Sequence, residues 1–169
     1  MTILELTMPE KIKDVQSPTG FTRLMWRTPI WMYRLHLGWL MGGRFLLLHH
    51  TGRVSGQPRQ NVLEVVGHNK ETDVYQIAAG FGKGSDWYKN ILKTPEVEIQ
   101  VGSKKSLRTA VPLEPEKSGE AMVAYAHEHP RAAKELMQIC GYKVDGTDED
   151  YFILGRDIIP FIELQPRSP

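Results

Sequence analysis

The fold is decided by the stretch FLLLHHTGRVSGQPRQNVLEVV, residues 45–66. An apolar run, Phe45–Leu48, precedes a short segment that contains Gly52 and Gly56, and a second apolar run follows Asn61. Two extended segments joined by a glycine-containing turn are typical of a β-hairpin. Both glycines can adopt the positive φ values that a tight connection requires. We therefore predict two antiparallel strands joined by a tight turn.

The predicted turn combines groups that bind anions. Successive backbone N–H groups in such a turn form an anion-binding concavity. Ser55 adds a hydroxyl, and Arg53 and Arg59 add guanidinium groups. Each charge-assisted hydrogen bond from arginine to a phosphate oxygen contributes about 1.5–3 kcal/mol. We interpret the hairpin tip as a phosphate-binding site, and an exposed turn with solvated arginines is the alternative.

Composition indicates one domain of ordinary globular type. The chain has 169 residues, 41% hydrophobic and 24% charged, and a chain of this length buries about 70% of its unfolded surface. A net charge of +1 gives no field that attracts nucleic acid. The single cysteine, Cys140, cannot form an internal disulfide. Because residues 1–16 also lack an apolar signal core, we expect a cytoplasmic protein without a nucleic-acid partner.

Residues 1–18 are polar and are predicted to form an N-terminal arm, followed by a single domain over residues 19–169. Residues 19–43 are rich in Trp, Met and Leu, but arginines keep every uncharged run below the roughly 18 residues of a membrane span. Pro29 suits the first turn of a helix, so we predict one short helix before it and another over residues 29–41. We predict an amphipathic helical segment that packs on the protein's own sheet or covers a cofactor. The alternative is contact of residues 21–41 with a membrane interface, at the inner face of the cell membrane.

The rest of the chain alternates between strands and helices. A turn over residues 67–71 leads into a third strand, Val74–Ala79. We predict further strands over residues 96–101, 105–113 and 158–164, helices over 86–93, 115–128 and 130–141, and a helical turn over 151–154. Pro160 interrupts the last strand, which places it at a sheet edge. Hairpin-connected strands with peripheral helices predict the α+β class and a small antiparallel barrel.

A second glycine-rich loop, Gly80–Gly84, precedes the helix predicted over residues 86–93. Free N–H groups and the helix dipole favour anions at such a position. The loop matches neither the P-loop nor the dinucleotide-binding pattern. At the start of the helix, Trp87 and Tyr88 are able to flank a planar ring and Asn90 to bond its edge. Plain core packing of Trp87 is the alternative.

No pattern in the sequence indicates a metal site or a nucleophile. His49 and His50 are adjacent on a predicted strand and therefore point to opposite faces. Glu64 is most simply interpreted as the ion-pair partner of a neighbouring arginine. We assign no catalytic residue, and Tyr88 and Tyr125 are the candidate proton donors.

Two segments of this sequence together carry a resemblance. They are Gly52-Arg53-Val54-Ser55-Gly56-Gln57-Pro58-Arg59, followed by a strand, and Asp86-Trp87-Tyr88-Lys89-Asn90-Ile91 with Pro95-Glu96-Val97 downstream. The combination resembles the deazaflavin-dependent nitroreductase family over about Leu46 to Gly102. The resemblance implies a split antiparallel β-barrel, similar to FMN-binding split barrels, with peripheral helices. It also implies binding of the deazaflavin coenzyme F-420.

The resemblance also assigns expected cofactor contacts. The hairpin tip would hold the coenzyme's phosphate and acidic tail, two strands would border the ring, and the following helix would form the opposite wall. The tip residues are Arg53, Val54, Ser55, Gly56 and Arg59, with Val54 at a position where many members have lysine. Lys83 is the candidate for a second cationic contact. The ring residues are Val62, Leu63, Ala78, Ala79 and Gly80, and the wall residues are Trp87, Tyr88 and Asn90.

The activity implied by the resemblance is hydride transfer from the reduced deazaflavin to an electron-poor acceptor such as a quinone, an enone or a nitroaromatic. A lipophilic quinone fits the membrane-seeking composition of residues 21–41. Two alternatives stay open: an FMN-dependent reductase of the same fold, and a non-catalytic protein that binds a cofactor or a fatty acyl ligand. Split barrels occur as monomers and as homodimers, and either state is expected here.

Overall fold

The computed structural model describes residues 8–14, 29–35 and 37–167. Most of the predicted N-terminal arm and the first part of the predicted helical segment, residues 19–28, lie outside the described residues. Within the described residues no helix is long and apolar enough to cross a membrane.

The described chain divides into two compact units. The first, the sheet unit, comprises residues 29–35, 37–78, 84–112 and 162–167 of the described chain. The second, the helical unit, comprises residues 8–14, 79–83 and 113–161. The predicted single domain over residues 19–169 stays a prediction.

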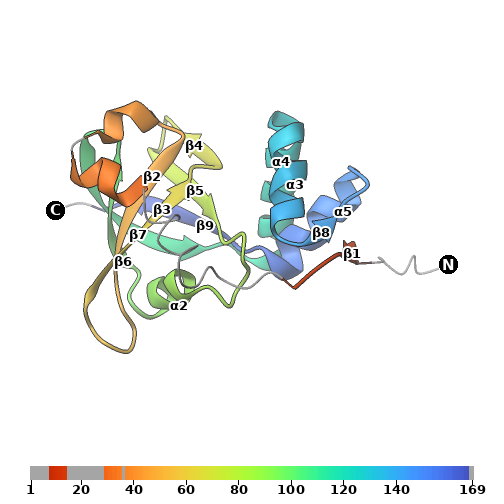
Figure 1. The fold of residues 1–169 in the computed structure, drawn as a ribbon, viewed down its shortest axis with the longest axis horizontal. Coiled ribbons are helices and arrows are strands. Elements are labelled where there is room, and N and C mark those ends of the chain that lie inside the picture. Colours follow the sequence, from red (N-terminus) through yellow and green to blue (C-terminus); the bar gives the residue numbers. More distant parts are fainter. Residues whose placement is uncertain (1–7, 15–28, 36, 168–169) are drawn as a thin grey trace. The chain divides into compact units, whose positions relative to one another are not determined.

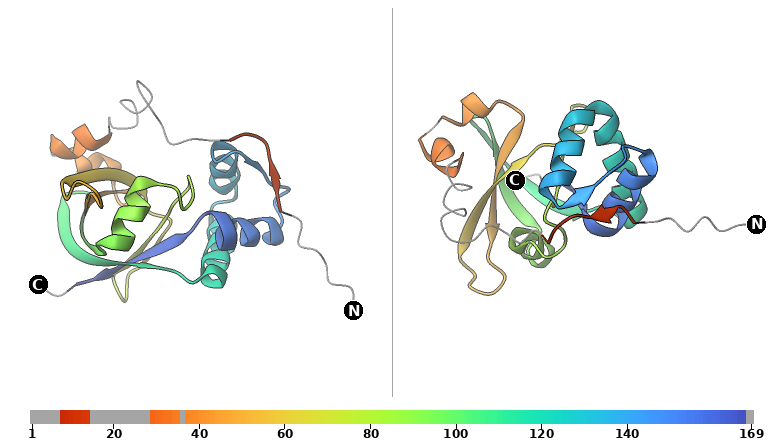
Figure 2. Two further views of the ribbon diagram at one scale, coloured as in Figure 1. Left: turned by 90° about the horizontal axis from the view of Figure 1, so that it is seen from below. Right: turned by 45° about the vertical axis from the view of Figure 1, so that its right-hand side comes forward.

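A seven-stranded antiparallel sheet forms the core of the sheet unit (Figure 1). Its spatial order is β3-β2-β6-β7-β9-β5-β4. The strands are β2 (Phe45–Thr51), β3 (Pro58–Glu64), β4 (Gly67–Asn69), β5 (Val74–Ala78), β6 (Glu96–Val101), β7 (Lys104–Pro112) and β9 (Phe161–Pro166). Because β3 and β5 also contact each other, the sheet curls into a half-barrel (Figure 2). The predicted α+β class with a split antiparallel barrel is confirmed.

The decisive hairpin is formed by β2 and β3, in register from Phe45 opposite Glu64 to Thr51 opposite Pro58. Gly56 has a positive φ of 65°, as predicted. Gly52 does not, so its predicted positive φ is wrong. Its small size matters instead, because a Cβ there would lie 2.7 Å from the Ser55 Oγ.

The helix α2 (Asp86–Lys93) has the predicted bounds. Its side chains Trp87, Tyr88, Asn90 and Ile91 are buried, and the helix packs against β2 and β7. Asn90 of α2 bonds His50 of β2. Because alternate strand residues share a face, the helix packs on the face of β2 that also carries Leu46 and Leu48. The strands curve around this helix (Figure 2).

The opposite face of β2 is covered by the chain that precedes it. Residues 29–34 are helical and η1 (Gly38–Met41) follows, so the predicted helix over 29–41 consists of two pieces. Ile30 and Tyr33 pack on Leu47 of β2, and the Tyr33 hydroxyl donates to the Phe45 carbonyl at 3.0 Å. The predicted packing of this segment on the protein's own sheet is therefore confirmed for its described part.

The sequence interpretation missed the strand β4, which replaces the turn predicted over residues 67–71. The turn lies further along the chain, where Asn69 Oδ1 accepts from the N–H groups of Glu71 and Thr72 at 2.9 and 3.2 Å. Asp73 closes it with a φ of 53°, an uncommon conformation for a residue with a side chain. Register with β5 then pairs His68 with Tyr75.

The predicted edge position of the last strand is wrong. The strand β9 lies between β7 and β5 in the interior of the sheet. Pro160 precedes β9, and so removes none of its ladder donors, while its carbonyl accepts from the Ala79 N–H at 3.0 Å. The residues before it form the π-helical turn η2 (Leu154–Ile158) rather than a strand.

The helical unit contains three α-helices and the turn η2. The predicted helices over 115–128 and 130–141 are confirmed as α3 (Pro115–Glu128) and α4 (Pro130–Ile139). The predicted turn over 151–154 is part of α5 (Asp148–Ile153), which Thr147 caps by accepting from the Asp150 N–H. A two-stranded sheet of β1 (Glu10–Lys11) and β8 (Tyr142–Lys143) completes the unit.

Candidate functional site

The tip of the β2–β3 hairpin is anchored to α2 by Asn90. This side chain is only 4% exposed. Its Oδ1 accepts from the Arg53 backbone N–H at 3.0 Å and from Arg53 Nη1 at 3.1 Å. One buried amide therefore fixes both the backbone and the guanidinium of Arg53.

The anchoring network continues through His50 to β3. The Asn90 Nδ2 lies 3.1 Å from His50 Nδ1, and His50 Nε2 lies 2.9 Å from Asn61 Oδ1. A neutral imidazole protonated at Nε2 satisfies both bonds, because it accepts from Asn90 and donates to Asn61. Burial lowers the pKa of His50, which favours this neutral form.

One face of α2 supplies all the helix contacts to the tip. Asp86 Oδ1 accepts from Arg53 Nη2 at 2.9 Å, and Lys93 Nζ donates to the Arg53 carbonyl at 2.8 Å. Asp86, Asn90 and Lys93 are four and three residues apart, the spacing of side chains on one helix face. The helix therefore holds Arg53 at three points.

Some polar groups at the tip have no partner among the residues that the structure describes. The Arg59 side chain is exposed and makes no hydrogen bond or ion pair with any described residue. Within the same described part, the N–H groups of Val54 and Ser55 donate no hydrogen bond. The Ser55 Oγ accepts from the Gln57 N–H at 3.3 Å. An exposed guanidinium beside free N–H groups is an arrangement that binds an anion.

The residues expected to border a ring separate onto two faces. Leu63 lies opposite Leu46, on the side of β3 that faces α2. Val62 lies on the other side, against the cluster of Ile30, Tyr33 and Leu47. Because neighbouring strand residues point in opposite directions, the structure does not bring Val62 and Leu63 together on one surface.

The expected wall residues are largely inside the protein. Trp87 and Tyr88 are each 7% exposed, with ring centroids 6.2 Å apart in an edge-to-face arrangement. Burial raises the pKa of the Tyr88 phenol. The Asn90 side-chain amide hydrogen-bonds Arg53 and His50, so its contacts in this structure are with the protein itself.

The remaining expected contacts lie at the end of β5 and in the loop after it. Ala78 ends β5 in the sheet unit, whereas Ala79, Gly80 and Lys83 belong to the helical unit. A Cβ at Gly80 would lie 3.4 Å from Cys140 Sγ, and burial raises the pKa of that thiol to about 11. Cys140 is therefore a packed, unreactive thiol at the end of α4.

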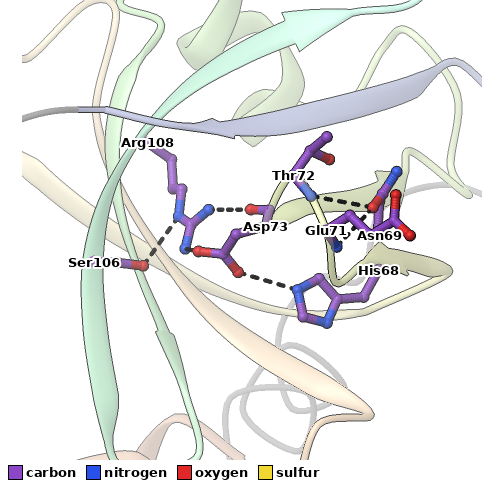
Figure 3. A network of polar contacts seen from close by, with 7 residues as sticks. All are labelled: His68, Asn69, Glu71, Thr72, Asp73, Ser106 and Arg108. Carbon is purple, nitrogen blue, oxygen red and sulfur yellow. Dashed lines mark hydrogen bonds and ion pairs between the residues drawn. The ribbon is translucent and has the colours of Figure 1, made fainter.

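A second polar network holds the β4–β5 turn (Figure 3). Arg108 of β7 is 3% exposed and donates to the Asp73 carbonyl, to Asp73 Oδ2 at 2.7 Å and to Ser106 Oγ at 3.0 Å. His68 Nε2 lies 3.1 Å from Asp73 Oδ1. The Arg108 guanidinium keeps the pKa of the Asp73 carboxyl below its usual value. These contacts tie the turn to β7 and explain how Asp73 sustains its positive φ.

Other expectations can be compared directly with the contacts. The predicted arginine partner of Glu64 is Arg44, at 3.5 Å between Nε and Oε1. Among the described residues there is no group of three or more His, Cys, Asp or Glu side chains arranged for a metal ion.

Sequence reasoning missed His50 as part of the network that anchors the hairpin tip. Its alternation with the buried Leu46 and Leu48 was the available signal.

Known proteins are similar to this chain in sequence or in fold. Residues 25–135 match the model of the family described as F420H(2)-dependent quinone reductase. The F420H(2)-dependent quinone reductase Rv1261c of Mycobacterium tuberculosis (strain ATCC 25618 / H37Rv) is 40% identical over 73 residues, which cover 41% of this chain and 47% of that protein. The chain thus spans about half the length of the curated relatives it matches.

Solved structures support the fold. A pyridoxamine 5'-phosphate oxidase-related, FMN binding protein from Nostoc punctiforme PCC 73102 is 17% identical, with a TM-score of 0.51 over 83% of this chain and 80% of that chain. The protein Atu2129 of Agrobacterium tumefaciens str. C58 has a TM-score of 0.53 at 13% identity, over 92% of this chain and 59% of that one. The family match extends over more than half of the sequence, from the helical segment before β2 to α4, and the chain belongs to the F420H(2)-dependent quinone reductase family.

Proposed function

We propose that this protein is an oxidoreductase that uses the deazaflavin coenzyme F-420 to reduce a quinone. The observation that carries the proposal is the anchored hairpin tip, where the Arg59 side chain and the N–H groups of Val54 and Ser55 have no hydrogen-bond partner in the part of the chain that the structure describes. These residues lie inside the segment that matches the family. The names of the family and of the relative Rv1261c give the proposed cofactor and acceptor class.

In this proposal the coenzyme supplies the hydride and the protein supplies position. Arg53, Arg59, Ser55 and the backbone of Val54 hold the phosphate and the acidic tail, and Gly56, whose N–H donates to the Gly52 carbonyl at 2.8 Å, shapes the tip around them. The buried Asn90 keeps Arg53 in one orientation before a ligand arrives, so little ordering is required on binding. Preorganised donors of this kind raise affinity without new contacts.

The ring contacts remain as the resemblance assigns them. On the α2 side of the sheet unit these are Leu63, Trp87, Tyr88 and Asn90. The remaining proposed contacts are Val62, Ala78, Ala79, Gly80 and Lys83.

The exposed side of the segment before β2 supports a lipophilic acceptor. Ile30 and Tyr33 are buried against the sheet, whereas Trp31 is 55% and Trp39 61% exposed. The other apolar side chains exposed on this segment are Leu35, Leu37 and Leu40. Arg34 stacks its guanidinium 5.1 Å from the Trp31 ring centroid. Apolar and aromatic side chains with a neighbouring cation suit a membrane interface, so we propose that this surface rests on the inner face of the cell membrane, where quinones dissolve.

The test is a tryptophan-fluorescence titration of the purified protein with the deazaflavin coenzyme and, separately, with FMN. We expect quenching by the deazaflavin at micromolar or lower concentration, and oxidation of the reduced coenzyme by a quinone. Arg59→Ala should weaken binding without changing stability, and Arg53→Ala should weaken both. Binding of FMN alone would identify a flavin reductase. Coenzyme binding without turnover would identify a binding protein. If neither ligand bound, the proposal would be contradicted.

A further inference from the structure

The outward side of the Arg53 guanidinium is already occupied by a carboxylate. Nη2 donates to Asp86 Oδ1 at 2.9 Å, and Nη1 also approaches the Asp86 carbonyl at 3.4 Å. The side chains of Arg53 and Asp86 are 31% and 83% exposed. The ion pair therefore lies where solvent and dissolved anions reach it.

Asp86 is not required to hold the hairpin tip. The buried Asn90 bonds the backbone N–H and Nη1 of Arg53, and Lys93 bonds its carbonyl. An exposed ion pair such as Arg53–Asp86 contributes little to stability because both charges remain solvated. The Asp86 carboxylate therefore matters mainly for the charge of the tip.

The charge of Asp86 determines which cationic groups of the tip are available to an anion. Arg53 is neutralised by Asp86, whereas the side chain of Arg59 makes no ion pair with the described residues. An incoming phosphate or carboxylate must displace the Asp86 carboxylate from Arg53. It must also come close to the negative charge that Asp86 keeps. A ligand that also contacts Arg59 and the N–H groups of Val54 and Ser55 gains bonds that offset this displacement.

We propose that Asp86 is an intramolecular competitor built into the anion-binding tip. It occupies Arg53 in the free protein and lowers the affinity of the tip for anions, because a ligand must displace the carboxylate and bind close to its negative charge. The identity of the natural ligand rests on the proposed function, whereas the competition itself rests on the Arg53–Asp86 pair.

The test compares Asp86→Asn and Asp86→Ala with the wild type. Asp86→Asn keeps an oxygen acceptor for Arg53 and removes the charge, and Asp86→Ala removes both. Glu71→Gln is the control, because it removes the same charge from an exposed residue at the β4–β5 turn. Affinities for the deazaflavin coenzyme and for inorganic pyrophosphate are measured at low and at high salt.

We expect both Asp86 variants to bind each probe about three- to tenfold more tightly at low salt, the effect of one nearby unit charge at a protein surface. The gain should shrink at high salt, and Glu71→Gln should stay within about twofold of the wild type.

If Asp86 instead braces Arg53, Asp86→Asn will bind like the wild type and Asp86→Ala will bind more weakly. That result would overturn the proposed competition. It would also be overturned if the Asp86 variants bound both probes with the affinity of the wild type, or if no protein bound either probe. Failure of the proposed function has a different signature. The coenzyme then binds to none of the proteins, while pyrophosphate still binds more tightly to the Asp86 variants.

Discussion

Asn90 Oδ1 accepts two hydrogen bonds from one residue, the backbone N–H and the guanidinium Nη1 of Arg53, at 3.0 and 3.1 Å. The two residues are 37 positions apart in the sequence. The bonds connect the middle of the short helix α2 to the tip of the β2–β3 hairpin, so that the geometry of the tip depends on a side chain outside it. Stability and anion binding are therefore coupled at this position.

We expect Asn90→Ala to lower both the stability of the protein and its affinity for an anion. It leaves the Arg53 N–H and the His50 Nδ1 without their partners, and an unsatisfied buried polar group costs about 1–3 kcal/mol. The free energy of unfolding, measured by denaturant titration, should fall by about 2–4 kcal/mol, and coenzyme binding should weaken. Lys93→Met is the control, because it removes one exposed bond to Arg53 and should cost less than about 1 kcal/mol. Equal stability of the two variants would contradict the anchoring role.

Val54→Lys should tighten binding of an anionic coenzyme. The Val54 side chain is 92% exposed at the hairpin tip, so the substitution disturbs no packing. An added cation there raises the positive charge of the tip beside Arg53 and Arg59. We expect affinity to rise several-fold at low salt and to approach that of the wild type at high salt, measured by fluorescence titration. Unchanged affinity at low salt would place the acidic part of the ligand elsewhere.

Trp31→Ser and Trp39→Ser together should weaken association with liposomes that contain anionic lipid. Both side chains are more than half exposed, so their loss removes interfacial anchors while Ile30 and Tyr33 keep the segment on the sheet. Co-sedimentation measures the bound fraction. Exposed Leu107 on β7 provides a matched control, since Leu107→Ser removes apolar surface outside this segment. Liposome binding that is equal in all three proteins would contradict membrane contact through this surface.

Stability should decrease in mildly acidic solution because of the two neighbouring histidines. Burial lowers the pKa values of His49 and His50 below the ordinary 6.5. Below pH 6.5 the unfolded chain therefore binds protons that the folded chain does not, and the free energy of unfolding falls as the pH decreases toward the folded pKa values. Above 6.5 their contribution is complete. Denaturant titrations between about pH 8 and about pH 5 measure the slope, and His50→Gln should reduce it. A slope that is unchanged in this variant would contradict the assignment.

The elements that the sequence predicted well are those with a local signal. The hairpin has apolar strands around a glycine-containing turn, and α2 has Ser85 before it and Pro95 after it. The strand β4 was missed because its turn depends on Asp73, which adopts a positive φ that only its contact with Arg108 explains. The position of β9 was wrong because the π-helical turn η2 moves Pro160 out of the strand.

Long-range side-chain pairs of the site could not be predicted. His50 and Asn90 meet across 40 residues, and no periodicity in one sequence reports such a contact. The residue types at the tip were correctly interpreted as able to bind an anion. That Arg53 is already paired with Asp86 while Arg59 makes no ion pair with the described residues follows only from the packing of α2 on β2.

A last long-range feature is the close contact between α3 and η2 in the helical unit. A Cβ at Gly155 would lie 2.5 Å from the Ser118 carbonyl oxygen and 2.6 Å from Met122 Cβ. Because backbone must move to make room, Gly155→Ala should destabilise the protein by about 2–4 kcal/mol. Gly43→Ala is the control, since a Cβ there meets nothing within 4 Å and should change stability by no more than about 1 kcal/mol. Thermal unfolding measures both variants, and equal midpoints would show that α3 and η2 are packed less closely than described here.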